Sequence, residues 1–200
     1  RRWGHDRAGG HSPPPLHPEL PGQADPGGGP AADPEGRACA PNAGGGQRTI
    51  LCGVRSRALA GRLGRWNLAR FDRSRLAGGF VSREQPSAID DPSIRNGFYG
   101  APAVCVVFAQ EDFLYSIPDA FCCAENMALA ACELGISSCI VARAEETFDH
   151  PEGRVLMQAW GIPEGYIPRC FVLLGYADGP YPGPKPDRDG RIRIVESEEA

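Results

Sequence analysis

The stretch PDAFCCAENMALAACEL at residues 118–134 constrains the fold of this chain more than any other segment. Pro118 suits the first turn of a helix, Asp119 complements the positive end of the helix dipole, and Gly135 suits a left-handed stop. The predicted helix is apolar on nearly all sides, and most of its apolar residues are small. Such a helix must be covered on several sides, so we expect it in a core or at a subunit interface.

The segments around this helix predict a fold that mixes helices and strands. The Val-rich run at 102–109 is continuous, as in strands that are covered on both faces. Ser56 is expected to cap one further helix, and Asp149 with Glu152 forms a capping-box pattern at another that stops at Gly161. Irregular alternation favours an α+β fold over a doubly wound sheet. The expected strands are 49–54, 102–109, 137–144 and 168–176, the helices are 56–71, 118–134 and 149–161, and a tail at 182–195 ends in a strand.

Residues 1–37 differ from the rest of the chain, because they hold eight Pro, eight Gly and three of the four His. This composition cannot bury enough apolar surface to fold alone. Two interpretations are open: a natural disordered tail or linker, and a stretch of GC-rich gene read out of frame, since the chain begins with Arg. We expect residues 1–37 to be disordered or aberrant, residues 38–195 to form one domain, and residues 196–200 to be an acidic tail.

Charge and cysteine usage exclude several classes of function. The net charge of −4 and the pI near 5.6 give no reason to expect nucleic acid or an anionic membrane as a partner. No apolar run approaches the length of a bilayer span. The eight cysteines fall mostly in apolar segments and in no CxxC pair. Buried, reduced thiols in the cytoplasm therefore fit better than a disulfide framework.

Side chains that could carry catalysis are scarce in residues 38–200. His150 is the only histidine there, and its position at a predicted helix start is explained by capping. Cys122 and Cys123 are adjacent, so a helix would point them about 100° apart, which suits neither zinc nor a dithiol. Glu145 and Glu146 are interpreted as solvated surface. This scarcity favours a cofactor that supplies the reactivity, or no enzyme at all.

Two segments have the composition of a cofactor site. The loop PNAGGGQ at 41–47 would offer free backbone N–H groups and the amides of Asn42 and Gln47 to a ring edge or a phosphate. The alternative is a plain connecting loop, because the stretch matches no standard phosphate-binding motif. The tail KPDRDGRIR at 185–193 has enough cations to hold a phosphate, and its alternative is a solvated basic turn.

The order of the motifs resembles the nitroreductase family of FMN-dependent oxidoreductases. That family pattern has a polar loop near the N-terminus, a GAP-type strand start, a long small-residue helix with an Asn, and then GIPEGY, LGY and KPxR. The matching stretches here are APNAGGGQ (40–47), FYGAPAVCVVFA (98–109), AENMALAACELGISSCIVARAEETF (124–148), WGIPEGYIPRCFVLLGY (160–176) and KPDR (185–188). Each is weak alone, but the ordered set is specific.

The resemblance implies an α+β fold with a mixed or antiparallel central sheet flanked by helices, and the long helix at a homodimer interface. It implies FMN as cofactor and NAD(P)H as electron donor, with hydride passing through the flavin N5 to a small acceptor such as a nitroaromatic or a quinone. The loop of one subunit would lie along a flavin held mainly by the other. No catalytic side chain is assigned, and the implied flavin contacts are Asn42, Ala43, Gly44, Gln47, Val141, Ala142, Arg143, Lys185 and Arg188.

One part of the family pattern has no counterpart here. The family begins with an Arg-Arg-Ser-x-Arg signature on its first helix, and residues 1–37 contain nothing equivalent. The resemblance resumes abruptly at residue 38, which favours the out-of-frame interpretation of the preceding stretch. Two alternatives for the whole chain stay open: an inactive truncated product with the flavin fold, and a Cys-rich thiol- or metal-binding module.

Overall fold

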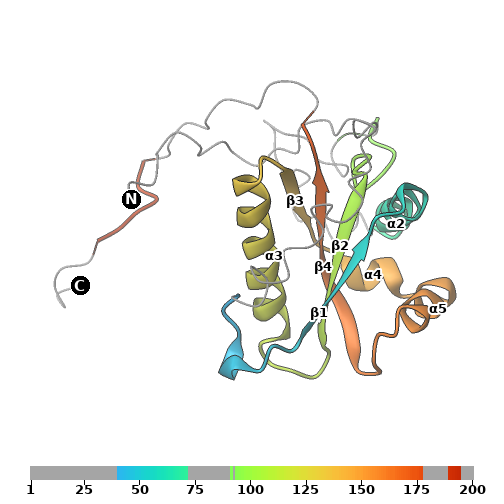
Figure 1. Ribbon diagram of the computed structural model, residues 1–200, viewed down its shortest axis with the longest axis horizontal. Helices are drawn as coiled ribbons and strands as arrows, with labels where there is room; N and C mark the ends of the chain where they lie inside the picture. Colours follow the sequence, from blue (N-terminus) through green and yellow to red (C-terminus); the bar gives the residue numbers. More distant parts are fainter. Residues whose placement is uncertain (1–39, 72–90, 92, 178–188, 195–200) are drawn as a thin grey trace.

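The computed structural model describes residues 40–71, 91, 93–177 and 189–194. Its centre is an antiparallel sheet with the strand order β1-β2-β4-β3 (Figure 1). The strands are β1 (Thr49–Val54), β2 (Ala103–Gln110), β3 (Ser137–Val141) and β4 (Tyr166–Gly175). Every neighbouring pair runs antiparallel. The four strands expected before the tail all form, and the predicted α+β fold is confirmed.

Helices cover both faces of this sheet. Helix α3 (Ser116–Glu133) lies along one face, and α2 (Arg57–Ala69), α4 (Ala144–Phe148) and α5 (Pro151–Ala159) lie on the other (Figure 1). A short 3-10 turn, η2 (Ala43–Gly45), precedes β1. The three layers put the start of β1 near the first turn of α3 and the end of β3 near α2.

The two central strands bury side chains on both faces, as the apolar run at 102–109 predicted. Val104, Val106 and Phe108 of β2 point into the core beneath α2, α4 and α5. The intervening residues, Cys105 and Val107 among them, point into the core beneath α3. The same alternation in β4 completes two apolar layers with a single sheet between them, because successive side chains of a strand point to opposite faces.

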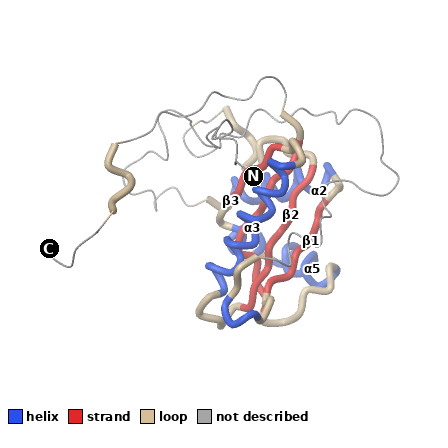
Figure 2. The backbone as a smooth tube through the Cα atoms, turned by 60° about the vertical axis from the view of Figure 1, so that its left-hand side comes forward, coloured by secondary structure: helices blue, strands red, loops and turns tan. Residues whose placement is uncertain are grey.

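Helix α3 packs on the sheet through alanines and leaves large apolar side chains on its outer side. Ala120, Ala124 and Ala131 lie in the core beneath the helix. Leu129 on the outer side, and Leu134 at the C-cap just beyond the helix, are each 60% exposed. Figure 2 shows the helix running along the strands with this outer side away from the sheet. The expectation that the helix contributes to the core is confirmed, and its outer face remains open.

Helix ends agree with the sequence in some places and correct it in others. Ser56 caps α2 as expected, since its side chain accepts a hydrogen bond from the Leu59 N–H. Asp149 does not cap α5: His150 is the N-cap and accepts from the Gly153 N–H. Helix α4 was not predicted, because five residues are too few for a visible apolar period. The strand expected at the end of the tail does not form within residues 189–194.

A bulge interrupts the pairing of β2 with β4. The register passes from Val107 opposite Cys170 to Phe108 opposite Pro168, which leaves Arg169 as the extra residue. Proline has no N–H to donate, so a bulge is a position in a central strand that tolerates it. None of the helices in the described part of the chain combines the length and the apolar character that crossing a bilayer requires.

Candidate functional site

The loop at residues 40–47, here called the glycine loop, lies before β1 and beside the first turn of α3 (Figure 1). Gly44 and Gly45 have φ angles of 62° and 65°, and Gln47 has a φ of 45°. A side chain added at Gly44 or Gly45 would meet nothing within 4 Å. The glycines are therefore required by the left-handed backbone, and the outer side of the loop is open.

Side chains hold the glycine loop at three points. The Asp119 Oδ1 accepts the Ala43 N–H at 2.9 Å. The Asn42 Oδ1 accepts the Gln47 N–H at 2.9 Å, which closes the loop on itself. Arg48 donates to the Ala43 carbonyl at 3.2 Å, and its guanidinium lies 4.6 Å above the Phe113 ring. The loop is thus tied to the start of α3 and to the segment that precedes this helix.

The loop offers fewer free N–H groups than its composition suggested. Carbonyls of the turn itself accept the N–H groups of Gly45 and Gly46 at 3.3 and 3.4 Å. Within residues 42–47, the N–H groups of Asn42 and Gly44 have no acceptor in the described ranges, and of these only Gly44 lies among the open glycines. A phosphate nest needs several converging N–H groups. One free N–H on an open glycine surface suits the edge of a flat ring better.

The second part of the site, here called the β3–α4 corner, consists of Ala142, Arg143 and the start of α4. Arg143 has a left-handed backbone with a φ of 64°. Asn67 of α2 is 1% exposed, and its Nδ2 donates to the Ala142 carbonyl at 3.3 Å and to Thr147 Oγ1 at 3.0 Å. Thr147 Oγ1 in turn donates to the Arg143 carbonyl at 2.7 Å. One buried amide therefore fixes the path of the chain from β3 into α4.

The Arg143 side chain belongs to the same network. Its Nη2 donates to the Asn67 Oδ1 at 2.9 Å, and its guanidinium lies 4.4 Å above the Phe71 ring. Burial lowers the pKa of Arg143, and the charges of Glu146 and Tyr99 partly oppose this shift. Its Nη1 is buried and has no hydrogen-bond partner in the described part of the chain. An acceptor on a bound molecule would satisfy this group, whose isolation is costly.

The glycine loop and the β3–α4 corner do not meet within one chain. The loop precedes β1 and the corner follows β3, and β2 and β4 lie between these two edge strands. Three strand spacings correspond to about 14 Å. The loop contacts α3 on one face of the sheet, and the corner contacts α2 on the other. Val141 was predicted to contact the flavin together with Ala142 and Arg143. It is the last residue of β3 and lies directly before the corner.

The predicted cations of the tail are only partly visible. Lys185 and Arg188 lie outside the described residues. The described part of the tail, 189–194, is exposed throughout, and Ile192 is 83% exposed.

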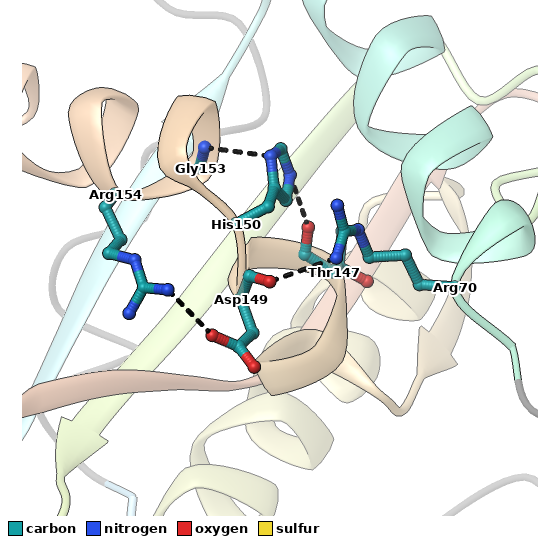
Figure 3. Close-up of polar contacts among 6 residues, drawn as sticks. All are labelled: Arg70, Thr147, Asp149, His150, Gly153 and Arg154. Atoms are coloured by element: carbon teal, nitrogen blue, oxygen red, sulfur yellow. Dashed lines mark hydrogen bonds and ion pairs between the residues drawn. The ribbon is translucent and has the colours of Figure 1, made fainter.

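The turn between α4 and α5 explains the single histidine of the domain. His150 donates from Nε2 to the Thr147 carbonyl at 3.1 Å and accepts the Gly153 N–H at Nδ1, so one neutral tautomer satisfies both contacts (Figure 3). Arg70 donates to the Asp149 carbonyl at 3.0 Å. Arg154 pairs with the Asp149 carboxylate at 3.3 Å. The ring of His150 is thus a structural cap, as the sequence predicted.

Thiols and carboxylates in the described ranges form no cluster of three that could hold a metal ion. No disulfide joins any two of the seven cysteines within these ranges. Burial raises the pKa of Cys139 to about 11 and, with smaller contributions from Cys123 and Cys105, that of Cys170 to about 12. Thiolates are the reactive form of cysteine, so burial works against nucleophilic chemistry at these two positions.

Sequence reasoning missed three of the groups that shape the site. Asn67 could have been found, since it is a polar residue on the apolar face of a predicted helix, where a buried hydrogen-bond partner is expected. Thr147 and Arg48 gave no local signal, because their partners lie in segments that only the fold brings close. Asp119 was assigned to the helix dipole, and its contact with the glycine loop was not predicted.

Comparison with known proteins identifies one family that this chain matches. The model of the Nitroreductase family matches residues 31–176. A nitroreductase with bound FMN from Bacteroides fragilis NCTC 9343 is 26% identical with a TM-score of 0.67, and the alignment covers 93% of this chain and 94% of that one. Another from Desulfitobacterium hafniense DCB-2 is 27% identical with a TM-score of 0.69, covering 94% and 95%.

An FMN-dependent nitroreductase from Clostridium difficile R20291 shares the fold at 18% identity, with a TM-score of 0.65 and coverage of 94% and 96%. A search of curated protein sequences finds no match. The family match extends over most of the chain, and the antiparallel sheet with its central small-residue helix agrees with it. This chain belongs to the nitroreductase family.

Proposed function

We propose that this chain is the subunit of a homodimeric, FMN-dependent oxidoreductase that uses NAD(P)H to reduce a small acceptor such as a nitroaromatic or a quinone. The observation that carries this proposal is the similarity to two FMN-bound nitroreductases at 26% and 27% identity, each over more than nine-tenths of both chains. The proposal places the protein in the cytoplasm, where its thiols would stay reduced.

The described residues fit a flavin in two respects. The glycine loop has an open surface with one available N–H at Gly44. The corner has an unsatisfied guanidinium N–H at Arg143, held by Asn67. Asn42, Ala43, Gly44 and Gln47 would line one side of the ring, and Val141, Ala142 and Arg143 the other. Lys185 and Arg188 would bind the phosphate, because cationic donors form the strongest hydrogen bonds to phosphate oxygens.

FMN, when bound, would supply the hydride and electron transfer between NAD(P)H and the acceptor. The residues of this chain would position the ring. The Gly44 N–H would donate to its polar edge, and Arg143 would present a positive charge close to the ring. We assign no side chain as a general acid or base, since His150 is used as a helix cap.

The separation of the two parts of the site supports a dimer. Since the glycine loop and the β3–α4 corner lie at opposite edges of the sheet, a flavin that contacts both needs the loop of a second copy. The outer side of α3 offers a surface for such a contact, because Leu129 is 60% exposed there, and Ile117 and Leu134 are more than half exposed at the two ends of the helix. A second copy packed along α3 would cover these apolar side chains.

Absorbance spectroscopy tests the proposal directly. The full chain, purified with added FMN and desalted, should keep a yellow flavin spectrum. Anaerobic addition of NADH or NADPH should bleach it, and addition of a quinone or nitroaromatic should restore it. Sedimentation of the same sample should give the mass of a dimer. A chain that retains no FMN, or a flavin band that neither nucleotide bleaches, contradicts the proposed function.

A further inference from the structure

Asp119 is the buried carboxylate that the proposed function does not use. It lies in the first turn of α3 and is 6% exposed. Its Oδ1 accepts the Ala43 N–H at 2.9 Å, across 76 residues of sequence. Its Oδ2 is buried and has no hydrogen-bond partner within the described ranges. The carboxylate therefore joins the central helix to the middle of the glycine loop.

The burial of Asp119 costs free energy that a role in stabilising α3 alone does not explain. An acidic side chain in the first turn gains from the helix dipole at the surface as well as when buried. A buried carboxylate with one unsatisfied oxygen loses hydration that a single hydrogen bond does not replace. A helix-dipole role alone thus gives no reason for the burial of the side chain or for its contact with the loop.

The Asp119 contact lies directly before the part of the loop whose backbone has the greatest conformational freedom. Ala43 precedes the two glycines with left-handed φ angles, and the outer side of those glycines is open. Glycine backbones have the largest conformational freedom, so a fixed position for this turn needs an external anchor. Arg48 provides a second anchor at the Ala43 carbonyl, and Asp119 holds the N–H of the same residue.

We propose that Asp119 is the positioning residue of the glycine loop, and that its oxygen acceptor, rather than its charge, fixes the Gly44 backbone against the flavin. This inference rests on the proposed function for its second half only. The anchoring of the loop is a property of the chain without any cofactor.

Two variants separate the acceptor from the charge. Asp119→Asn removes the charge and keeps an oxygen that can accept the Ala43 N–H. Asp119→Ala removes both. Ser116→Ala is the matched control: Ser116 is 2% exposed in the same helical turn, and the hydrogen bond of its Oγ comes from the Arg169 Nε, at 2.9 Å, rather than from the loop.

Hydrogen exchange of the Ala43 amide, followed in a peptide covering residues 40–48 of the full chain, is the first measurement. We expect exchange to accelerate about tenfold or more in Asp119→Ala, the loss expected for one hydrogen bond, and to stay near wild type in Asp119→Asn and Ser116→Ala. Unchanged exchange in Asp119→Ala overturns the anchor. Equal acceleration in Asp119→Asn and Asp119→Ala assigns the effect to the charge, which also overturns the proposal.

The dissociation constant for FMN, measured by flavin fluorescence, is the second measurement. It should rise about tenfold in Asp119→Ala and change less than about twofold in Asp119→Asn. An unchanged constant in Asp119→Ala, with the loop shown to be released, overturns the role in flavin positioning. A wild-type chain that binds no FMN defeats the proposed function instead, and hydrogen exchange still decides whether Asp119 anchors the loop.

Discussion

The glycine loop is held from outside by side chains around an exposed backbone, whereas the β3–α4 corner is held from within by one buried amide. Asp119 and Arg48 reach the loop at Ala43. At the corner, Asn67 makes hydrogen bonds to three neighbouring residues and is 1% exposed. The difference indicates that damage to the corner should unfold the chain locally, while damage to the loop should leave the fold intact and weaken binding.

The largest expected effect tests the corner. Asn67→Ala leaves partners at Ala142, Arg143 and Thr147 unsatisfied, so we expect the free energy of unfolding to fall by about 3 kcal/mol. Urea denaturation followed by circular dichroism measures this loss. The exposed amide of Gln158 in α5 gives the matched control, since Gln158→Ala should change stability by less than about 0.5 kcal/mol. A small loss in Asn67→Ala would break the distinction between the two parts of the site.

The next largest effect is expected on the binding of the FMN phosphate by the tail, which belongs to neither the glycine loop nor the β3–α4 corner. Replacing Lys185 and Arg188 together with Ala should weaken FMN binding by about 2 kcal/mol, because two charge-assisted hydrogen bonds are lost. The midpoint of thermal unfolding without FMN should not move. Arg191→Ala with Arg193→Ala removes the same charge from exposed positions and should affect affinity less. Equal losses in both double variants would reduce the role of Lys185 and Arg188 to a general charge effect.

A smaller effect tests the backbone of the loop. Gly44→Ala places a side chain at a φ of 62°, with no steric contact, and should cost about 1 kcal/mol of stability. Gly61→Ala in α2 should have the opposite sign, since alanine favours a helix by about 0.5–1 kcal/mol over glycine. Thermal unfolding of both variants measures the difference. A stabilised Gly44→Ala chain would show that the left-handed turn is not required.

The smallest expected effect is the contribution of Cys170 to the pH dependence of the free energy of unfolding, and it is absent at neutral pH. Burial raises the pKa of Cys170 from the ordinary 9.0 to about 12. At neutral pH this thiol is protonated in the folded and unfolded states alike. As the pH rises from 9 towards 12, the unfolded state loses its proton first, so the free energy of unfolding falls. Urea midpoints between pH 8 and 10.5 should fall less steeply in Cys170→Ala than in wild type, and Cys132→Ala, at an exposed position, should follow wild type.

Strands and long helices could be predicted because their cause is local. The Val-rich run became a central strand, and the small residues of 118–134 became a helix packed on the sheet. Helix α4 could not be predicted, since its five residues are fixed by Asn67 through Thr147 rather than by their own pattern. The expected strand of the tail is absent from residues 189–194, because alternating Arg and Ile predict a strand only where a neighbouring strand is available.

Candidate flavin residues were proposed from motif order, and their physical surroundings were not visible in the sequence. The glycines of the loop indicated an unusual backbone, which Gly44 and Gly45 have. The number of available N–H groups was overestimated, because hydrogen bonding within the turn depends on its three-dimensional path. Asp119 complements the dipole of its own helix and also accepts the Ala43 N–H of the loop, and only the first of these roles can be read from neighbouring residues.

The bulge at Arg169 has a consequence for how two sites in a dimer would communicate. As the extra residue of β4, Arg169 is 9% exposed at its side chain, and it donates to Ser116 of α3 and pairs with Glu145 of α4. It also donates to the Glu111 carbonyl at 3.1 Å. One guanidinium thus bridges the helix that anchors the loop and the helix that begins at the corner.

In the proposed dimer, each chain would give its loop to one flavin and its corner to the other. The hydrogen bonds of the Arg169 side chain would then connect the binding sites of two separate cofactors. Occupancy of one flavin could alter the affinity of the second through this residue, and the coupling would be the same in both directions. Arg169→Met, which keeps the length of the side chain without its hydrogen bonds, should make the two binding events independent.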